Sequence, residues 1–279
     1  DQVLGKTYGY RDGRTQGVDE DVYKIISEEE LYSRTGIQKQ SFNTIYQLMA
    51  VKKNNPEHLK AAKNFLMLPD YFHFLLTGQK CSEYTNATST QLINAQTNDW
   101  DWELIGRLGY PQEMFLPLSQ PGTLVGSFTK EIEEEVGFSC EVVLPATHDT
   151  GSAVMALPGE GDKNLYISSG TWSLMGIENK TAICTEESRK RNFTNEGGYE
   201  YRYRYLKNIM GLWMIQSVRK ELENKYSFAE LCAMASRRSD FPSRVDVNDP
   251  VFLAPDSMIR AIREMCAKTG HPVPETPDE

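Results

Sequence analysis

The chain is divided by residues 158–162 (PGEGD), and this segment constrains the fold more than any other feature of the sequence. Proline and glycine occupy three of its five positions and interrupt helices and strands, so the segment predicts a boundary between two domains. Apolar residues follow helical or strand periodicity on both sides of it. Helices and strands mixed along both halves predict an α/β protein with two domains.

Periodicity predicts the main helices of the N-terminal half. Phe42, Ile45 and Met49 recur at helical spacing, and Ser41 is the expected N-cap of their helix. A second predicted helix follows Pro69 and ends at Gly78.

The elements around and beyond the boundary matter more for function. Residues 140–144 predict a short buried strand, followed by a helix that holds Asp149 in its first turn. Residues 164–167 and 172–177 predict the two strands of a hairpin. Two apolar stripes then predict two helices: Leu206, Ile209, Met210, Trp213, Met214 and Val218, and Met258, Ile259, Ile262, Met265 and Cys266.

Composition excludes several classes of partner. The 279 residues include 30 Lys and Arg against 39 Asp and Glu, a net charge of −9 that disfavours nucleic-acid binding. No stretch approaches the ~18 consecutive apolar residues of a membrane helix, and the opening residues form no apolar leader, so we expect no membrane partner. The five cysteines are widely spaced and form no CxxC motif. This pattern predicts reduced thiols in a cytoplasmic protein and no metal site.

Residues 147–150 (THDT) are the sharpest candidate for chemistry. They follow the predicted strand and open the predicted helix, where exposed backbone N–H groups favour negative charge. A carboxylate there can take a proton from a substrate hydroxyl as a general base. Aspartate is also a common N-cap, so the residues alone leave Asp149 as either a base or a helix cap. His148 taken alone suits a structural hydrogen bond.

Two further segments suit phosphate or nucleotide binding. Residues 168–171 (SSGT) form a turn of small residues that either cradles a phosphate or simply joins two strands. They match neither a Walker A loop nor a GxGxxG motif. Residues 195–198 (NEGG) precede cations at Arg202, Arg204 and Lys207, which either face a nucleotide or belong to an ordinary strand.

Seven segments are each weak signals alone but become informative because of their order along the chain. They are residues 10–15 (YRDGRT), 69–72 (PDYF), 83–88 (EYTNAT), 148–150 (HDT), 168–176 (SSGTWSLMG), 194–198 (TNEGG) and 207–213 (KNIMGLW). Together they resemble the rhamnulokinase branch of the FGGY family of carbohydrate kinases. SSGTWSLMG and KNIMGLW are specific for this branch, and the resemblance covers essentially the whole chain.

The resemblance implies the actin-like ATPase, or ribonuclease H-like, two-domain fold of sugar kinases, incomplete at both ends. Residues 1–158 would be the C-terminal part of the sugar-binding domain, and residues 163–279 the N-terminal part of the nucleotide-binding domain. The implied activity is phosphorylation of L-rhamnulose at its 1-hydroxyl, in rhamnose catabolism. ATP would be the phosphoryl donor, accompanied by Mg²⁺.

The same resemblance implies roles for individual residues. Asp149 would be the general base and would also contact the sugar. The other implied roles are substrate contacts for His148, Thr150 and Asn208, and contacts with ATP for Gly170, Thr171 and Gln216.

Parts of the family pattern do not occur in this sequence. No Asp-x-Gly phosphate turn precedes Tyr10, and no Gly-Gly-Gly segment follows the last predicted helix. We therefore expect the chain to be an internal piece of such a kinase. By itself it should bind ATP weakly or not at all and be inactive.

Three other functions stay open. The first is a kinase for another ketose, of the xylulose or fuculose type. The second is a non-catalytic sugar-binding protein on the same fold, against which the 148–150 and 170–171 segments argue. A hydrolase that uses His148 and Asp149 would need a nucleophile that the sequence does not identify.

Overall fold

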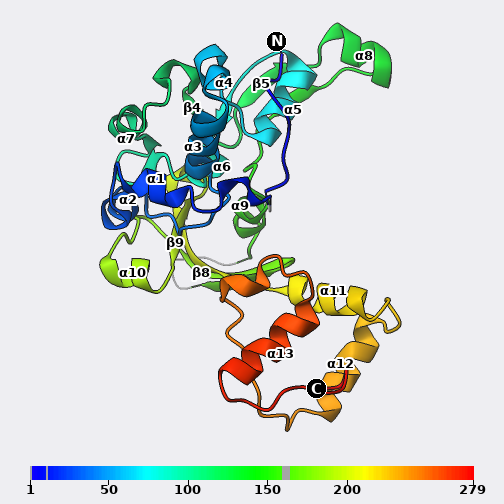
Figure 1. Ribbon diagram of the computed structural model, residues 1–279. Helices are drawn as coiled ribbons and strands as arrows, with labels where there is room; N and C mark the ends of the chain where they lie inside the picture. The colour runs from blue at the N-terminus through cyan, green and yellow to red at the C-terminus, as the bar shows by residue number, and fades with distance from the viewer. Residues whose placement is uncertain (1, 11, 159–163) are drawn as a thin grey trace. The chain divides into compact units, whose positions relative to one another are not determined.

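The computed structural model describes residues 2–10, 12–158 and 164–279 and contains both helices and strands, as predicted (Figure 1). The chain divides into two compact units. Unit 1 comprises Asp1–Tyr166 and Gly176–Lys207, and unit 2 comprises Ile167–Met175 and Asn208–Glu279. Residues 159–162 of the predicted boundary, residue 163, where the second domain is expected to begin, and Arg11 of the segment at 10–15 lie outside the described residues.

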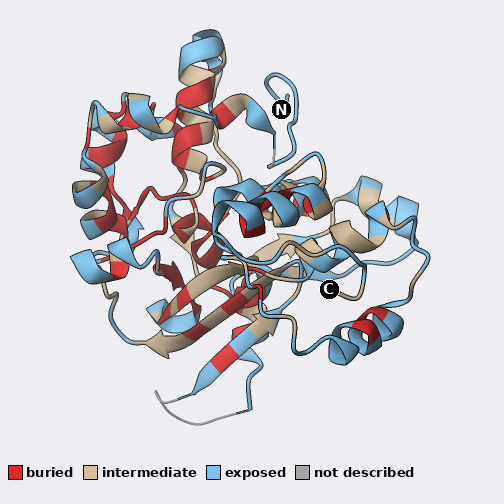
Figure 2. Ribbon diagram, turned by 60° about the horizontal axis from the view of Figure 1, so that its bottom comes forward, coloured by how far each residue is buried: buried red, intermediate tan, exposed pale blue. Residues whose placement is uncertain are grey.

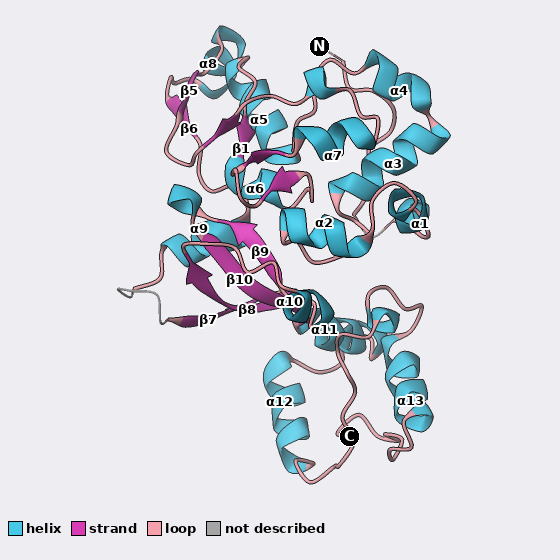
Figure 3. Cartoon of the chain, turned by 90° about the vertical axis from the view of Figure 1, so that its left-hand side faces the viewer, coloured by secondary structure: helices cyan, strands magenta, loops and turns pink. Residues whose placement is uncertain are grey.

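Unit 1 is built mainly from short helices (Figure 3). The helices are α1 (Asp19–Tyr23), α2 (Glu28–Thr35), α3 (Thr44–Asn54), α4 (Pro56–Ala61), α5 (Leu68–Thr77), α6 (Tyr84–Thr88), α7 (Trp102–Arg107), α8 (Lys130–Val136), α9 (Asp149–Met155) and α10 (Glu186–Lys190). Three short 3₁₀ turns also belong to it: η1 (Gly13–Thr15), η2 (Gln112–Met114) and η3 (Tyr199–Tyr201).

Three two-stranded sheets connect these helices. Strand β1 (Ser82–Glu83) pairs in parallel with β4 (Leu118–Ser119), and β2 (Ile93–Asn94) pairs antiparallel with β3 (Asp99–Trp100). Strand β5 (Leu124–Ser127) pairs antiparallel with β6 (Glu141–Val143). The strand predicted at residues 140–144 therefore exists, but the prediction that it is buried is wrong, because this ribbon is narrow and leaves Val143 50% exposed.

The four-stranded sheet has the order β7-β8-β10-β9. Its strands are β7 (Leu165–Ser169), β8 (Trp172–Asn179), β9 (Thr194–Gly197) and β10 (Tyr203–Met210). Neighbouring strands β7 and β8 confirm the predicted hairpin. Strands β9 and β10 are antiparallel, with Leu206 opposite Thr194 and Tyr203 opposite Gly197.

The helix predicted from Leu206 to Val218 is wrong over its first half. Residues up to Met210 are strand β10, and helix α11 (Leu212–Glu221) begins after Gly211. The same apolar residues suit a strand because aromatic and branched side chains pack well on a pleated surface. Pairing with β9 across the sheet decides between the two, and periodicity within one segment does not reveal that pairing.

Helix starts and ends follow local chemistry more closely. Helix α5 carries Pro69 in its first turn and ends at Gly78 with φ of 70°, as predicted. Helix α3 is also confirmed, but Ser41 is not its cap, because the helix begins at Thr44 after Asn43. The Asn43 side chain instead donates hydrogen bonds to Gln38 and Gln91.

The core of unit 1 lies between its helices (Figure 2). Trp100 is 2% exposed, and its ring lies 4.8 Å from that of Phe115 and 6.5 Å from that of Phe65. Its indole N–H donates to the Leu116 carbonyl at 2.8 Å, so the ring is buried without an unpaired polar atom.

Unit 2 contains three helices, of which α11 and α13 (Met258–Lys268) pack around a smaller core. The third is α12 (Phe228–Arg237), and the 3₁₀ turn η4 (Pro250–Phe252) also belongs to this unit. Met210, Phe252 and Met265 belong to the buried core. The helix predicted from Met258 to Cys266 is confirmed by α13. None of the described helices combines the length and apolar character needed to cross a membrane.

Candidate active site

Asp149 stands at the start of a helix with its carboxylate in solvent. It is the first residue of α9, and His148 is the N-cap residue, without a side-chain capping bond. The Asp149 side chain is 100% exposed, and its Oδ1 accepts a hydrogen bond from the Thr150 N–H at 2.6 Å. The structure therefore does not place Asp149 at the N-cap. Its carboxylate can meet a substrate without any prior rearrangement of the core.

A buried carboxylate fixes the loop that leads to Asp149. Glu83 is 0% exposed, and its side chain accepts bonds from the N–H and hydroxyl groups of Thr85 and from the N–H of Asn86. It also accepts bonds from the Thr147 N–H at 3.1 Å and the Thr147 hydroxyl at 2.8 Å. The backbone two residues before Asp149 is thereby tied to the core of unit 1.

His148 lies beside a buried ion pair. Arg204 is 0% exposed, and its guanidinium lies 3.1 Å from the Glu196 carboxylate. The same guanidinium donates to the Gly197 carbonyl at 3.1 Å and lies 3.3 Å from His148 Nδ1. Of the two interpretations left open for Arg204, its burial favours the ordinary strand: it is an internal residue that bonds to β9 and lies beside the His148 ring.

Electrostatics favour a neutral His148. Burial lowers the pKa of His148, and the Arg204 charge lowers it further, whereas the Glu196, Asp149 and Glu83 carboxylates raise it. The net effect is a pKa below the ordinary 6.5. The imidazole keeps 23% exposure, so a ligand can still reach its edge.

This shift predicts a loss of stability in acid. Below about pH 6.5 the unfolded chain binds a proton at His148 that the folded chain resists, so stability falls as the pH drops towards the folded pKa. A His148→Gln variant lacks this proton. The difference in unfolding free energy between wild type and variant should therefore be largest above pH 6.5 and shrink in acid. Urea unfolding at several pH values measures it, and a difference that is constant with pH would contradict the assignment.

In unit 2, the 170–171 turn is fastened to the start of α11. The Gly170 and Thr171 carbonyls accept bonds from the N–H groups of Leu212 and Trp213 at 3.0 and 3.1 Å. The Gly170 N–H donates to the Trp172 carbonyl at 2.8 Å, so it already has a partner inside the turn. The Thr171 side chain is exposed at the tip.

Gly211 lets the turn and α11 approach closely. A Cβ at this position would lie 2.6 Å from the backbone nitrogen of Ser173, which is closer than packed atoms allow. Gly211→Ala should lower the unfolding free energy by about 1–3 kcal/mol, because the backbone must shift to relieve the overlap. Urea unfolding measures this loss. Gly170→Ala is the matched control, because its Cβ would meet no atom closer than 3.6 Å, and an equal loss in both variants would contradict the argument.

The remaining predicted residues are placed as follows. Thr150 is buried at 5% exposure, beside Asp149. Asn208 lies half-buried on β10, and Gln216 lies exposed on α11. His148, Asp149 and Thr150 thus belong to unit 1, and Gly170, Thr171, Asn208 and Gln216 belong to unit 2.

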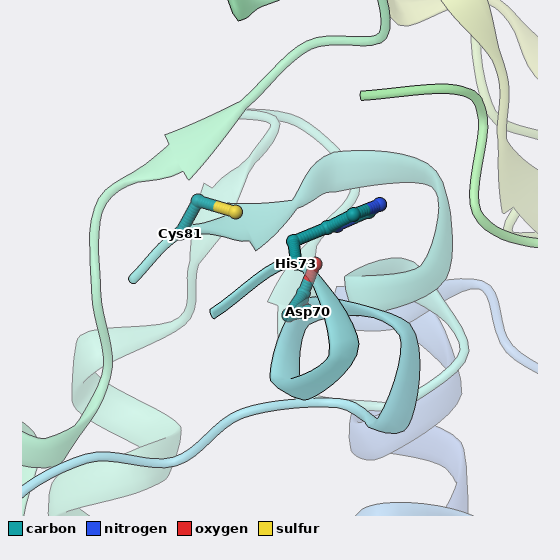
Figure 4. A group of neighbouring side chains, drawn as sticks. All are labelled: Asp70, His73 and Cys81. Carbon is teal, nitrogen blue, oxygen red and sulfur yellow. The ribbon is translucent and has the colours of Figure 1, made fainter. Parts of the chain in front are cut away.

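Sequence reasoning named Glu83 and Arg204 but missed that both support the site. Glu83 lies 64 residues from Thr147 in sequence, so nothing local indicates their contact. It also missed a group formed by Asp70, His73 and Cys81 (Figure 4). The only local signal for that group is the spacing of Asp70 and His73, which places them on one face of a helix.

Comparison with known proteins identifies relatives over the whole chain. Residues 1–156 match the family model for the N-terminal domain of the FGGY family of carbohydrate kinases, and residues 165–279 match the model for its C-terminal domain. The chain is 55% identical over 279 residues to a rhamnulokinase of Halalkalibacterium halodurans and 52% identical to one of Oceanobacillus iheyensis. The matched region spans 100% of this chain but only 59% of the length of each of these relatives.

Solved structures share the fold at low identity. A ligand-bound xylulose kinase from Lactobacillus acidophilus superposes with a TM-score of 0.73 at 18% identity, over 85% of this chain and 48% of that one. A glycerol kinase with ADP from Plasmodium falciparum gives a TM-score of 0.60 at 13% identity, over 79% of this chain and 46% of the other. The predicted sugar kinase fold is therefore confirmed.

Proposed function

Because the chain belongs to the FGGY family of carbohydrate kinases, we propose that the protein containing it phosphorylates L-rhamnulose at its 1-hydroxyl. The γ-phosphoryl group of ATP would be transferred to the sugar oxygen, giving L-rhamnulose 1-phosphate and ADP. Rhamnulokinases more than 50% identical over the whole chain support this choice of sugar. The step belongs to rhamnose catabolism and to the cytoplasm, where ATP is available.

The observation that carries the proposal is the exposed Asp149 carboxylate on a fixed backbone. Phosphoryl transfer asks an enzyme mainly to position its reactants and to orient the nucleophile. Asp149 can accept the proton of the 1-hydroxyl as that oxygen bonds to phosphorus. Glu83 holds the preceding Thr147, so the carboxylate starts from a defined place.

Neighbouring residues would complete the sugar side. We assign His148 a sugar contact, made by the exposed edge of its ring. The burial of Thr150 suits a different role, and its hydroxyl, 3.3 Å from Asp149 Oδ1, would orient the base. Asn208 is the further sugar contact that we propose. In this assignment residues 1–158 are the sugar-binding part and residues 163–279 the nucleotide-binding part.

The ATP side would be served by unit 2. ATP enters as its Mg²⁺ complex and is a substrate of the reaction. The exposed Thr171 would approach the phosphates, and Gln216 on α11 would contact the nucleotide. Because the Gly170 N–H already has a partner, Gly170 would serve by its small size rather than by donating to phosphate.

The test is ATP consumption with a panel of ketoses, coupled to the release of ADP. The whole protein should turn over with L-rhamnulose and more slowly with xylulose or fuculose. The 279 residues alone, measured beside it, should be inactive. Turnover by this chain alone at ordinary rates would contradict that expectation.

Other outcomes would select the rival functions. Faster turnover with xylulose or fuculose would identify a kinase for that ketose. Binding of L-rhamnulose without ATP consumption would favour a sugar-binding protein on the same fold and would remove the role of Thr171.

A further inference from the structure

Three potential metal ligands meet beside helix α5, outside the residues assigned to phosphoryl transfer. Asp70 and His73 lie one turn apart on α5, and Cys81 stands directly before β1 (Figure 4). One ligand atom from each, a carboxylate oxygen, a ring nitrogen and the thiol sulfur, lies within 4.8 Å of the other two.

Two atoms of this group are buried without a partner. Asp70 is 0% exposed, and its Oδ1 accepts a bond from the Glu83 N–H at 3.2 Å. Asp70 Oδ2 and His73 Nδ1 have no hydrogen-bond partner among the described residues. Buried polar atoms are nearly always paired, because an unpaired one loses its hydration with no compensation. Each of these two side chains thus carries a buried atom that a bound ion would pair.

We propose that Asp70, His73 and Cys81 bind a divalent transition metal, with Zn²⁺ as the best match. Zinc takes thiolate, imidazole and carboxylate ligands in a tetrahedron, whereas Mg²⁺ and Ca²⁺ take oxygen ligands. Three protein ligands leave the fourth position to water. Cys81 releases its thiol proton as the sulfur–metal bond forms.

The geometry requires only a small adjustment. Bond lengths of roughly 2.0–2.3 Å place the donor atoms of a tetrahedral zinc site about 3.4–3.7 Å apart. The three donors here lie within 4.8 Å of one another, so the widest pair closes by about 1 Å. A bound ion would tie α5 to the start of β1, next to the Glu83 backbone.

A metal-free arrangement is the competing explanation. Burial raises the pKa of Asp70 to about 7, so a protonated carboxyl could donate its hydrogen to the His73 ring instead. That arrangement needs no thiol. The role of Cys81 therefore separates the two explanations.

The experiment is a titration of the chelator-treated, metal-free chain with Co²⁺, followed by Zn²⁺. We expect one equivalent of Co²⁺ to give a thiolate-to-cobalt charge-transfer band with strong visible bands of tetrahedral cobalt, and Zn²⁺ to abolish both. Cys81→Ser and His73→Gln should each weaken binding by more than roughly 100-fold, since a lost ligand costs more than a lost outer-shell partner. Cys140→Ser is the matched control, because it removes an exposed thiol from the same unit.

Circular dichroism in the presence of chelator checks that each variant is folded. If one of the two variants does not fold, the other is sufficient to test the metal site. No saturable thiolate band in the wild-type chain would overturn the proposal. Unchanged Co²⁺ affinity in Cys81→Ser would overturn it as well and would favour the protonated Asp70. As a second readout, Zn²⁺ should raise the melting temperature of wild type and Cys140→Ser but not of Cys81→Ser.

Discussion

Asp149→Asn should lower kcat for sugar-dependent ATP consumption by about 10²–10⁴-fold, the usual contribution of a positioned general base. The amide has nearly the shape of the carboxylate but cannot accept the hydroxyl proton. Because the side chain is 100% exposed and lies outside the core, the melting temperature should not change. The measurement is coupled ADP release in the whole protein with saturating L-rhamnulose and ATP.

The control must remove a similar charge without touching the proposed chemistry. Glu141→Gln does so, because Glu141 is an exposed residue of β6 in the same unit. Its kcat should match wild type. If Asp149→Asn kept wild-type turnover, the base would have to be another residue. If Asp149→Asn lost activity together with its fold, the loss would not belong to catalysis, and the melting temperature distinguishes these cases.

The helices were predictable where their signals are local. Pro69 and Gly78 bound α5 because each residue restricts the backbone at its own position. The hairpin of β7 and β8 follows similarly from two short apolar segments around a turn of small residues. The helix prediction for Leu206 to Met210 was wrong for the opposite reason. Its pairing with β9 is a tertiary fact, and the apolar spacing fits a helix and a strand almost equally well.

In the candidate site, too, the features with local signals were predictable and those that depend on tertiary contacts were not. Asp149 could be singled out because its chemistry and its place at a helix start are both visible in the sequence. The contacts that position it could not, because Glu83 reaches Thr147 across 64 residues and Arg204 reaches His148 across 56. A charge pattern alone also could not show that Arg204 is buried, since most arginines lie at the surface.

The buried ion pair of Arg204 and Glu196 gives the largest expected effect on stability. Arg204→Met should lower the unfolding free energy by about 3–5 kcal/mol, because it leaves the nearly buried Glu196 carboxylate without its counter-charge. The Gly197 carbonyl loses its donor in the same step. Methionine keeps a long apolar side chain, so the loss reports the charge more than a cavity. Urea unfolding followed by fluorescence measures it.

Two comparisons make the result specific. Arg191→Met breaks an exposed ion pair with Glu187 in the same unit and should cost far less stability, because water screens the two charges. Adding Glu196→Gln to Arg204→Met should restore part of the lost stability, because no buried charge then remains uncompensated. Equal losses in Arg204→Met and Arg191→Met would mean that burial does not strengthen the first pair. A double variant less stable than Arg204→Met would mean that Glu196 stabilises the fold through His148 or another partner, independently of Arg204.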